Sequence, residues 1–157
     1  MGARSESLAT KVEQTIKDFL AAVEASTGEQ WAAPCSDGEW TQGFAAYHAA
    51  AAIGAITQTV KGVADGQSFP VMTMEKIDAE NAVQAKEHAS CTVAETIDLI
   101  KNSAPAAVSM VRSLTDAQLD RKVQLLEGMP EVTVETMVQM AMVGHAAYHL
   151  QTINGAR

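Results

Sequence analysis

Two histidines lie four residues apart near the end of the sequence, at positions 145 and 149. In an α-helix, residues at this spacing share one face with their Cβ atoms about 6 Å apart, so both imidazoles can reach one metal ion. A His-x-x-x-His pair alone is only weakly specific for metal binding. Its interpretation depends on whether the fold supplies a third ligand at the same level.

A third candidate ligand is His48, which the hydropathy pattern places on the inward side of another predicted helix. At the helical rise per residue, His48 lies about 10 Å from the start of its helix, while His145 and His149 lie about 14 and 8 Å from the end of theirs. The three levels coincide if these two helix ends meet. A single inward histidine is more often a hydrogen-bonded core residue than a ligand. Three of the 4 histidines at one level instead favour an open divalent-metal site.

The elements that must position these histidines are four predicted amphipathic helices. Apolar residues recur every three or four positions over residues 7–25, 41–64, 92–114 and 133–154. Thr41 and Thr133 are predicted N-caps of the second and fourth helices. Thr92 and Glu95 form a predicted capping box at the start of the third helix. The histidines thus belong to the second and fourth helices of a bundle.

The connection between the second and third helices, residues 65–91, decides the topology. If the three histidines converge, the second and fourth helices are antiparallel, and the second and third are parallel. Parallel neighbours need a crossover as long as the bundle, and residues 65–91 are long enough even with a short helix at about 77–87. We therefore predict an all-α fold, a four-helix bundle with this long crossover, in a single domain over residues 1–157.

The composition supports a helical protein and limits its partners. The chain is 47% hydrophobic but only 4% aromatic, with 4 prolines, which excludes an all-β sandwich. Its net charge of −8 has the wrong sign for binding phosphates, so we expect neither nucleic acid nor anionic membrane as a partner. Since the sequence lacks a membrane-length apolar run and a signal-peptide core, we expect a cytoplasmic protein with Cys35 and Cys91 as reduced thiols.

Four stretches of the sequence together resemble a known family. They are Trp31, DGEWT at 37–41, AYHA at 46–49 and GHAAYHLQTI at 144–153. With these motifs the chain resembles the DinB-like (DinB/YfiT) family of metal-dependent four-helix-bundle proteins over nearly its whole length. The resemblance implies His48, His145 and His149 as ligands of a divalent metal, but no particular substrate. We expect the substrate to be a small molecule. Relatives in that family include transferases and isomerases that use a low-molecular-weight thiol such as mycothiol, bacillithiol or glutathione.

The sequence leaves open the identity of the metal and the function of the protein. Three imidazoles accept zinc, nickel, iron or cobalt, and the resemblance favours nickel or zinc. The leading hypothesis is a metal-dependent enzyme, a thiol transferase or isomerase, in which the metal lowers the pKa of a bound thiol or water. The alternative is a non-catalytic metal-binding or stress-response protein.

Other residues are expected near the metal end of the bundle. Tyr148 is the candidate catalytic residue, because its hydroxyl can donate a hydrogen bond near a bound substrate. Cys35, His88 and Cys91 are expected at the same end, without an assigned role. The fourth helix is apolar nearly all round, and such a helix needs cover on both sides, which favours a homodimer.

Overall fold

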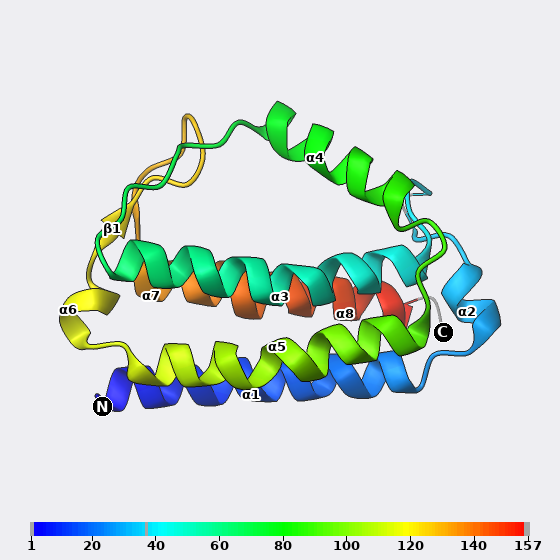
Figure 1. Cartoon of the computed structure of the whole chain (residues 1–157), viewed down its shortest axis with the longest axis horizontal. Helices are drawn as coiled ribbons and strands as arrows, with labels where there is room; N and C mark the ends of the chain where they lie inside the picture. Colours follow the sequence, from blue (N-terminus) through cyan, green and yellow to red (C-terminus); the bar gives the residue numbers. More distant parts are fainter. Residues whose placement is uncertain (1, 37, 156–157) are drawn as a thin grey trace.

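The structure is a computed structural model that describes residues 2–36 and 38–155. Asp37, in one of the resembling segments, and the two ends of the predicted 1–157 domain lie outside the described residues. Four long helical segments run side by side (Figure 1). They are α1 (Ala3–Glu24), α3 (Gln42–Ala64), α5 (Val93–Ser113) and the continuous segment formed by α7 (Val134–Met137), η1 (Val138–Gly144) and α8 (His145–Gly155). The prediction of a mostly helical fold is confirmed.

Shorter elements connect these helices. They are α2 (Gly28–Ala32), α4 (Met74–Glu87), α6 (Asp116–Leu119), β1 (Lys122–Val123) and β2 (Val132–Thr133). The two strands pair in antiparallel register, with Lys122 opposite Thr133. The all-α prediction missed this pair, because two residues per strand are too few to show the alternation that marks a strand.

Threonine side chains cap the N-termini of several helices, as predicted from the sequence. Thr41 Oγ1 accepts a hydrogen bond from the Phe44 backbone N–H at 3.1 Å. Thr92 and Glu95 form the predicted capping box, since the backbone N–H of each donates to the side chain of the other. Such caps satisfy N–H groups that the first turn of a helix leaves without partners. The helix starts are therefore encoded locally.

The bundle core is apolar and made by all four long helical segments. Its largest fully buried side chains include Phe19 of α1, Val60 of α3, Ile100 of α5 and Val138 of η1. Ion pairs such as Arg112 with Glu6, at 3.0 Å, link α1 to α5 at the surface. Exposed pairs of this kind contribute little to stability, so apolar burial holds the bundle together.

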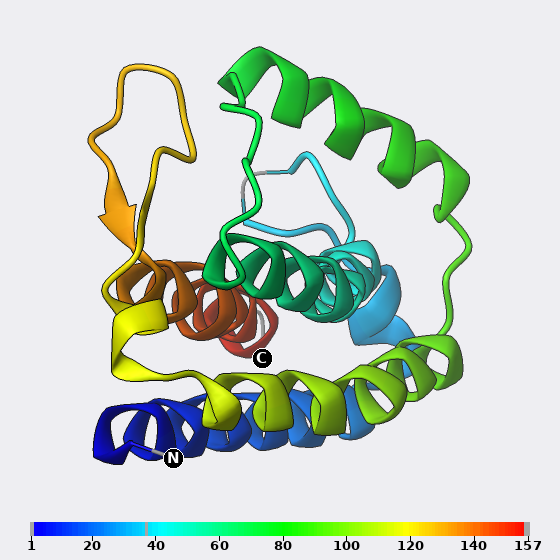
Figure 2. The same ribbon diagram turned by 60° about the vertical axis from the view of Figure 1, so that its left-hand side comes forward.

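The crossover helix α4 lies outside this bundle. Figures 1 and 2 show that α3 and α5 both begin at the end of the bundle where α2 lies, and that α4 returns the chain to that end along the outside. None of the residues of α4 is buried. Within the described part of the chain, no helix combines the length and the apolar character needed to cross a membrane.

The π-helical segment η1 sets the rotation of the helix that carries two histidines. Val134, Val138, Met142 and Ala146 are all buried, at intervals of four residues. In a regular α-helix, three such intervals would rotate the last residue by about 120° away from the first. The wider turns of a π-helix offset this rotation. Met142 is therefore buried, whereas its neighbour Ala141 is only half-buried.

Candidate metal centre

His48, His145 and His149 come together at the α2 end of the bundle. Each offers a ring nitrogen, and these three atoms lie within 4.8 Å of one another. The ring centroid of His48 is 5.3 Å from that of His145 and 5.5 Å from that of His149. The Nε2 atoms of His145 and His149 are 3.2 Å apart. Among the described residues, no other group of histidine, cysteine or acidic side chains is arranged in this way.

Trp40, in the loop before α3, covers this cluster. Its ring stacks on His149 with an interplanar angle of 10° at 6.3 Å and lies 5.0 Å from the His48 ring. Phe44 packs edge-on against Trp40, with 4.8 Å between ring centroids. The aromatic side chains limit the access of water to the imidazoles. Buried surroundings of this kind favour uncharged rings.

The surroundings of all three imidazoles favour the neutral form by lowering the pKa of each ring. Burial is the main cause and lowers the pKa of His145 to about 4, with a smaller contribution from His48. Burial, together with the two neighbouring histidines, lowers the pKa of His149 to about 3. The pKa of His48 is lowered by burial too, against a small opposing effect of its hydrogen bond with Gln84. Neutral imidazole is the form that binds a metal ion.

The spacing of His145 and His149 fits a bound cation. Two nitrogens bonded to one cation at about 2.1 Å lie about 3.0 Å apart at a right angle and about 3.4 Å apart at a tetrahedral angle. The observed 3.2 Å between the Nε2 atoms of His145 and His149 falls between these values. The Nδ1 atom of His149 is buried and has no hydrogen-bond partner among the described residues. No contact from a described residue at Nδ1 therefore opposes the tautomer in which Nε2 has the lone pair that a cation needs.

The cluster opens into a cavity of about 710 Å³ between α3, α8, α4 and the loop before α3. Ala52 and Ile56 of α3 contribute apolar lining, and Met74 and Ile77 belong to the part of α4 that lines it. None of the lining residues is a lysine or an arginine, and Glu39 is acidic. A cation at the cluster would therefore face a mostly apolar space large enough for a small molecule.

The other predicted site residues divide between two places. Tyr148 lines the mouth of this cavity and is 60% exposed. Cys35 is buried and lines the same cavity. His88 and Cys91 line a different cavity, of about 530 Å³, where the His88 ring stacks on Tyr47 at 4.5 Å. Burial raises the pKa of the Cys91 thiol, which therefore resists ionisation.

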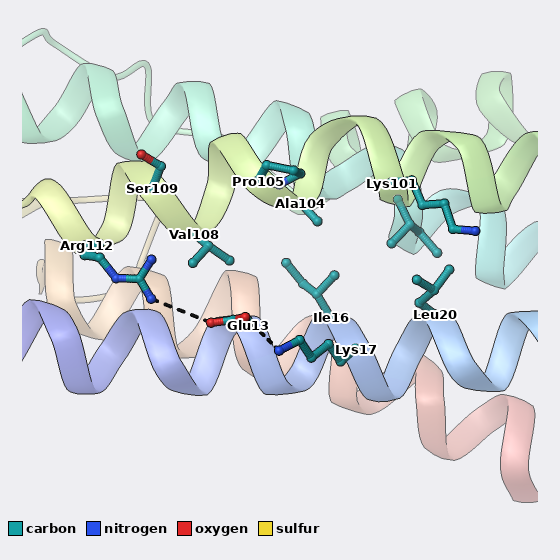
Figure 3. Close-up of a pocket in the computed structure, with 11 residues that line it drawn as sticks. Glu13, Ile16, Lys17, Leu20, Lys101, Ala104, Pro105, Val108, Ser109 and Arg112 are labelled. Carbon is teal, nitrogen blue, oxygen red and sulfur yellow. Dashed lines mark hydrogen bonds and ion pairs between the residues drawn. The ribbon is translucent and has the colours of Figure 1, made fainter.

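A further cavity, of about 490 Å³, lies between α1 and α5. Figure 3 shows Ile16 and Val108 pointing into it from the two helices, and Glu13 paired at the rim with Lys17 and Arg112. It offers apolar surface and charges that are already paired. The histidine cavity is therefore the better candidate for chemistry.

Two residues near the cluster were not predicted as functional. Trp40 was noted only as part of a resembling segment, although its ring contacts two of the histidines. Gln84 of α4 was given no role, yet its Oε1 lies 3.3 Å from His48 Nδ1. No local signal identifies Gln84, because it stands 36 residues from His48 and the contact depends on where the crossover passes.

Comparisons with known proteins support the fold and identify the family. The structure of YfiT from Bacillus subtilis matches with a TM-score of 0.77, over 99% of this chain and 87% of that chain, at 18% sequence identity. It is described as "a probable metal-dependent hydrolase with an unusual four-helix bundle topology", and at this identity the likeness shows the fold. A search of curated protein sequences finds no match. The family model of the DinB superfamily matches residues 11–153, so the chain belongs to that superfamily.

Proposed function

We propose that this protein is a metal-dependent enzyme in which His48, His145 and His149 hold one divalent cation. The observation that carries the proposal is the convergence of three neutral imidazoles within 4.8 Å beside a cavity. When bound, a divalent cation supplies Lewis acidity, which lowers the pKa of a thiol or water beside it. The resemblance favours nickel or zinc, and three imidazoles also suit iron or cobalt.

The chain's own residues divide the remaining tasks. The imidazoles provide uncharged nitrogen ligands, and Trp40 shields them from water. The apolar lining of the cavity binds the body of a small substrate. Tyr148, at the mouth, is placed to donate a hydrogen bond to that substrate. A purely structural metal would not need a cavity next to its ligands, which argues against the non-catalytic alternative.

The reaction class that we favour is transfer or isomerisation with a low-molecular-weight thiol. Thiolate is a good ligand for the cations named above. Members of the DinB-like family, which the sequence resembles, include enzymes that use such thiols. Hydrolysis is the second candidate, supported by the likeness to YfiT and its description as a probable metal-dependent hydrolase. The two classes differ in whether a thiol or a water molecule acts as the nucleophile.

The first experiment measures metal binding by the full chain. Wild-type protein should bind about one equivalent of Co²⁺, Ni²⁺ or Zn²⁺, and each single alanine variant of the cluster should bind at least 10-fold more weakly. His88→Phe is the matched control, because it removes the fourth histidine, which lies outside the cluster, and keeps an aromatic ring to stack on Tyr47. Wild-type affinity in the triple variant His48→Ala/His145→Ala/His149→Ala, measured by competition with a chelator, would overturn the proposal.

A second experiment separates the two reaction classes. Thiols added to the Co²⁺ protein should produce a charge-transfer absorption band if they bind at the cation. His88→Phe should keep this band, and His149→Ala should lose it. If thiols give no band while the Co²⁺ protein hydrolyses activated esters in a His149-dependent manner, the hydrolase assignment replaces the thiol assignment.

We also propose the relative directions of the helices in the bundle. The directions of the helices in Figure 1 support α3 antiparallel to α7–α8 and parallel to α5. Spin labels at Lys61 and Val134 test it, because this arrangement brings both positions to the end of the bundle away from the histidines. A separation of a bundle length between the labels would contradict it.

We also propose a homodimer, and light scattering that gives the monomer mass at all concentrations would exclude it.

A further inference from the structure

Gln84 is the residue through which α4 reaches the histidine cluster. Its side-chain oxygen, Oε1, lies 3.3 Å from Nδ1 of His48. An amide oxygen only accepts hydrogen bonds, so this contact requires a proton on Nδ1. A neutral imidazole carries one proton, and Nε2 of His48 is then left with its lone pair. The contact therefore selects which nitrogen of His48 can bind a cation.

The same contact matters for α4, which has little else to hold it in place. α4 contributes no buried residue. Before it, Met72 exchanges backbone hydrogen bonds with Leu125 and Glu127, at 3.0 and 2.9 Å. After it, His88 stacks on Tyr47 at 4.5 Å. Between these two attachments, Gln84 gives α4 a polar contact with a bundle helix.

We propose that Gln84 is a positioning residue that fixes the Nδ1–H tautomer of His48, and that it thereby couples cation binding to the docking of α4 over the cavity. The inference rests on the proposed function, because it concerns the same histidines. A ligand histidine commonly donates its other ring N–H to an acceptor that orients the ring. A cation at Nε2 makes the Nδ1–H a stronger donor, which strengthens the bond to Gln84.

Coupling of this kind is reciprocal. If docked α4 increases the affinity of the cluster for a cation, the cation must stabilise docked α4 by the same factor. α4 also carries Met74, Ile77 and Asn81 at the cavity. Loading of the metal site would therefore complete the wall against which the substrate binds.

The first test uses metal-free protein and is independent of cation binding. In ¹⁵N NMR spectra recorded at neutral pH, His48 of the wild type should show mainly the Nδ1–H tautomer. Gln84→Leu removes the acceptor and should shift His48 toward the Nε2–H tautomer, whereas Gln84→Glu restores an acceptor and should keep Nδ1–H. Asn81→Leu, a polar-to-leucine change on the same helix and at the same cavity, is the control and should behave as wild type. An unchanged tautomer in Gln84→Leu would overturn the proposal.

The second test measures the coupling. Gln84→Leu should weaken Co²⁺ binding about 10-fold, and Gln84→Glu should not weaken it. Co²⁺ should slow amide hydrogen exchange in α4 of the wild type and not in α4 of Gln84→Leu. Equal affinities of wild type and Gln84→Leu, or an equal effect of Co²⁺ on exchange in both, would refute the coupling. If wild-type protein binds no cation, the proposed function and the coupling fail together, while the tautomer measurement still decides whether Gln84 positions His48.

Discussion

The four-helix bundle and the crossover that passes over it differ in how they are held. Each long helical segment of the bundle buries large apolar side chains, among them Phe19, Val60 and Ile100, which are fully buried. The crossover helix α4 buries none of its residues, and Met74 and Val83 on it are 57% and 54% exposed. Apolar burial therefore stabilises the bundle, whereas a few polar and aromatic contacts locate α4.

This difference places the candidate chemistry at the boundary between a rigid and a weakly held part. The three histidines come from bundle helices α3 and α8, so their positions are set by well-packed elements. The opposite wall of the cavity comes from α4, which has few buried contacts. Regions with few buried contacts open at low free-energy cost, so α4 can move while the four-helix bundle stays packed.

The largest expected effect concerns the tight packing of the bundle core. Phe19→Ala should lower the free energy of unfolding by about 3–5 kcal/mol, because Phe19 is 0% exposed and its removal leaves a cavity. Phe69→Ala makes the same change in the half-buried segment before α4 and should cost clearly less. Urea unfolding followed by circular dichroism measures both. Equal losses would show that the crossover is packed as tightly as the bundle.

The next effect concerns the junction where the crossover returns to the bundle. A Cβ at Gly43 of α3 would clash with the ring of Trp31, whose Nε1 donates a hydrogen bond to the Cys91 carbonyl. Gly43→Ala should therefore displace Trp31, destabilise the protein by about 1–3 kcal/mol and shift the tryptophan emission. Gly54→Ala on the same helix meets nothing closer than 3.9 Å and should be neutral or stabilising by up to about 1 kcal/mol. A Gly43→Ala variant as stable as wild type would contradict the tight Trp31 contact.

The third prediction concerns pH and the histidine end of the bundle in the metal-free protein. Burial depresses the pKa of His149 to about 3 in the folded protein, from 6.5 when unfolded. Its stabilising contribution is therefore complete above about pH 6.5 and is lost as the pH falls toward 3, because the unfolded chain binds the proton first. Between pH 7 and pH 5 this loss is about 2 kcal/mol.

A comparison of variants isolates this loss. His149→Gln cannot titrate, so its stability should fall by about 2 kcal/mol less than that of wild type between pH 7 and pH 5. Guanidinium unfolding at both pH values gives the difference. Parallel pH profiles of wild type and His149→Gln would show that His149 is not held neutral.

The smallest expected effect concerns the weak packing of the crossover helix α4. Val83→Ala truncates an apolar side chain of α4 that is 54% exposed, and it should change the free energy of unfolding by less than about 0.5 kcal/mol. Denaturant titration of wild type and variant in parallel can resolve a change of this size. A loss above about 1 kcal/mol would mean that Val83 packs against the bundle in solution.

The sequence by itself determined the features that depend on neighbouring residues. Apolar periodicity located the four long helical segments, and the Thr41 cap and the Thr92–Glu95 capping box fixed two helix starts. The spacing of His145 and His149 implied a shared helix face, and their Nε2 atoms do lie 3.2 Å apart. These features were predictable because helical hydrogen bonds, caps and i, i+4 pairs involve residues within one or two turns.

Only the tertiary structure decided the features that depend on distant residues or on small departures from ideal geometry. The contact of Gln84 with His48 joins residues 36 positions apart, and the stacking of Trp40 on His149 depends on a loop meeting another helix. The π-helical turns of η1 keep the histidine face inward, and the sequence analysis assumed a regular α-helix there. Such contacts are fixed by how all the helices pack together, because no local hydrogen-bond pattern specifies them.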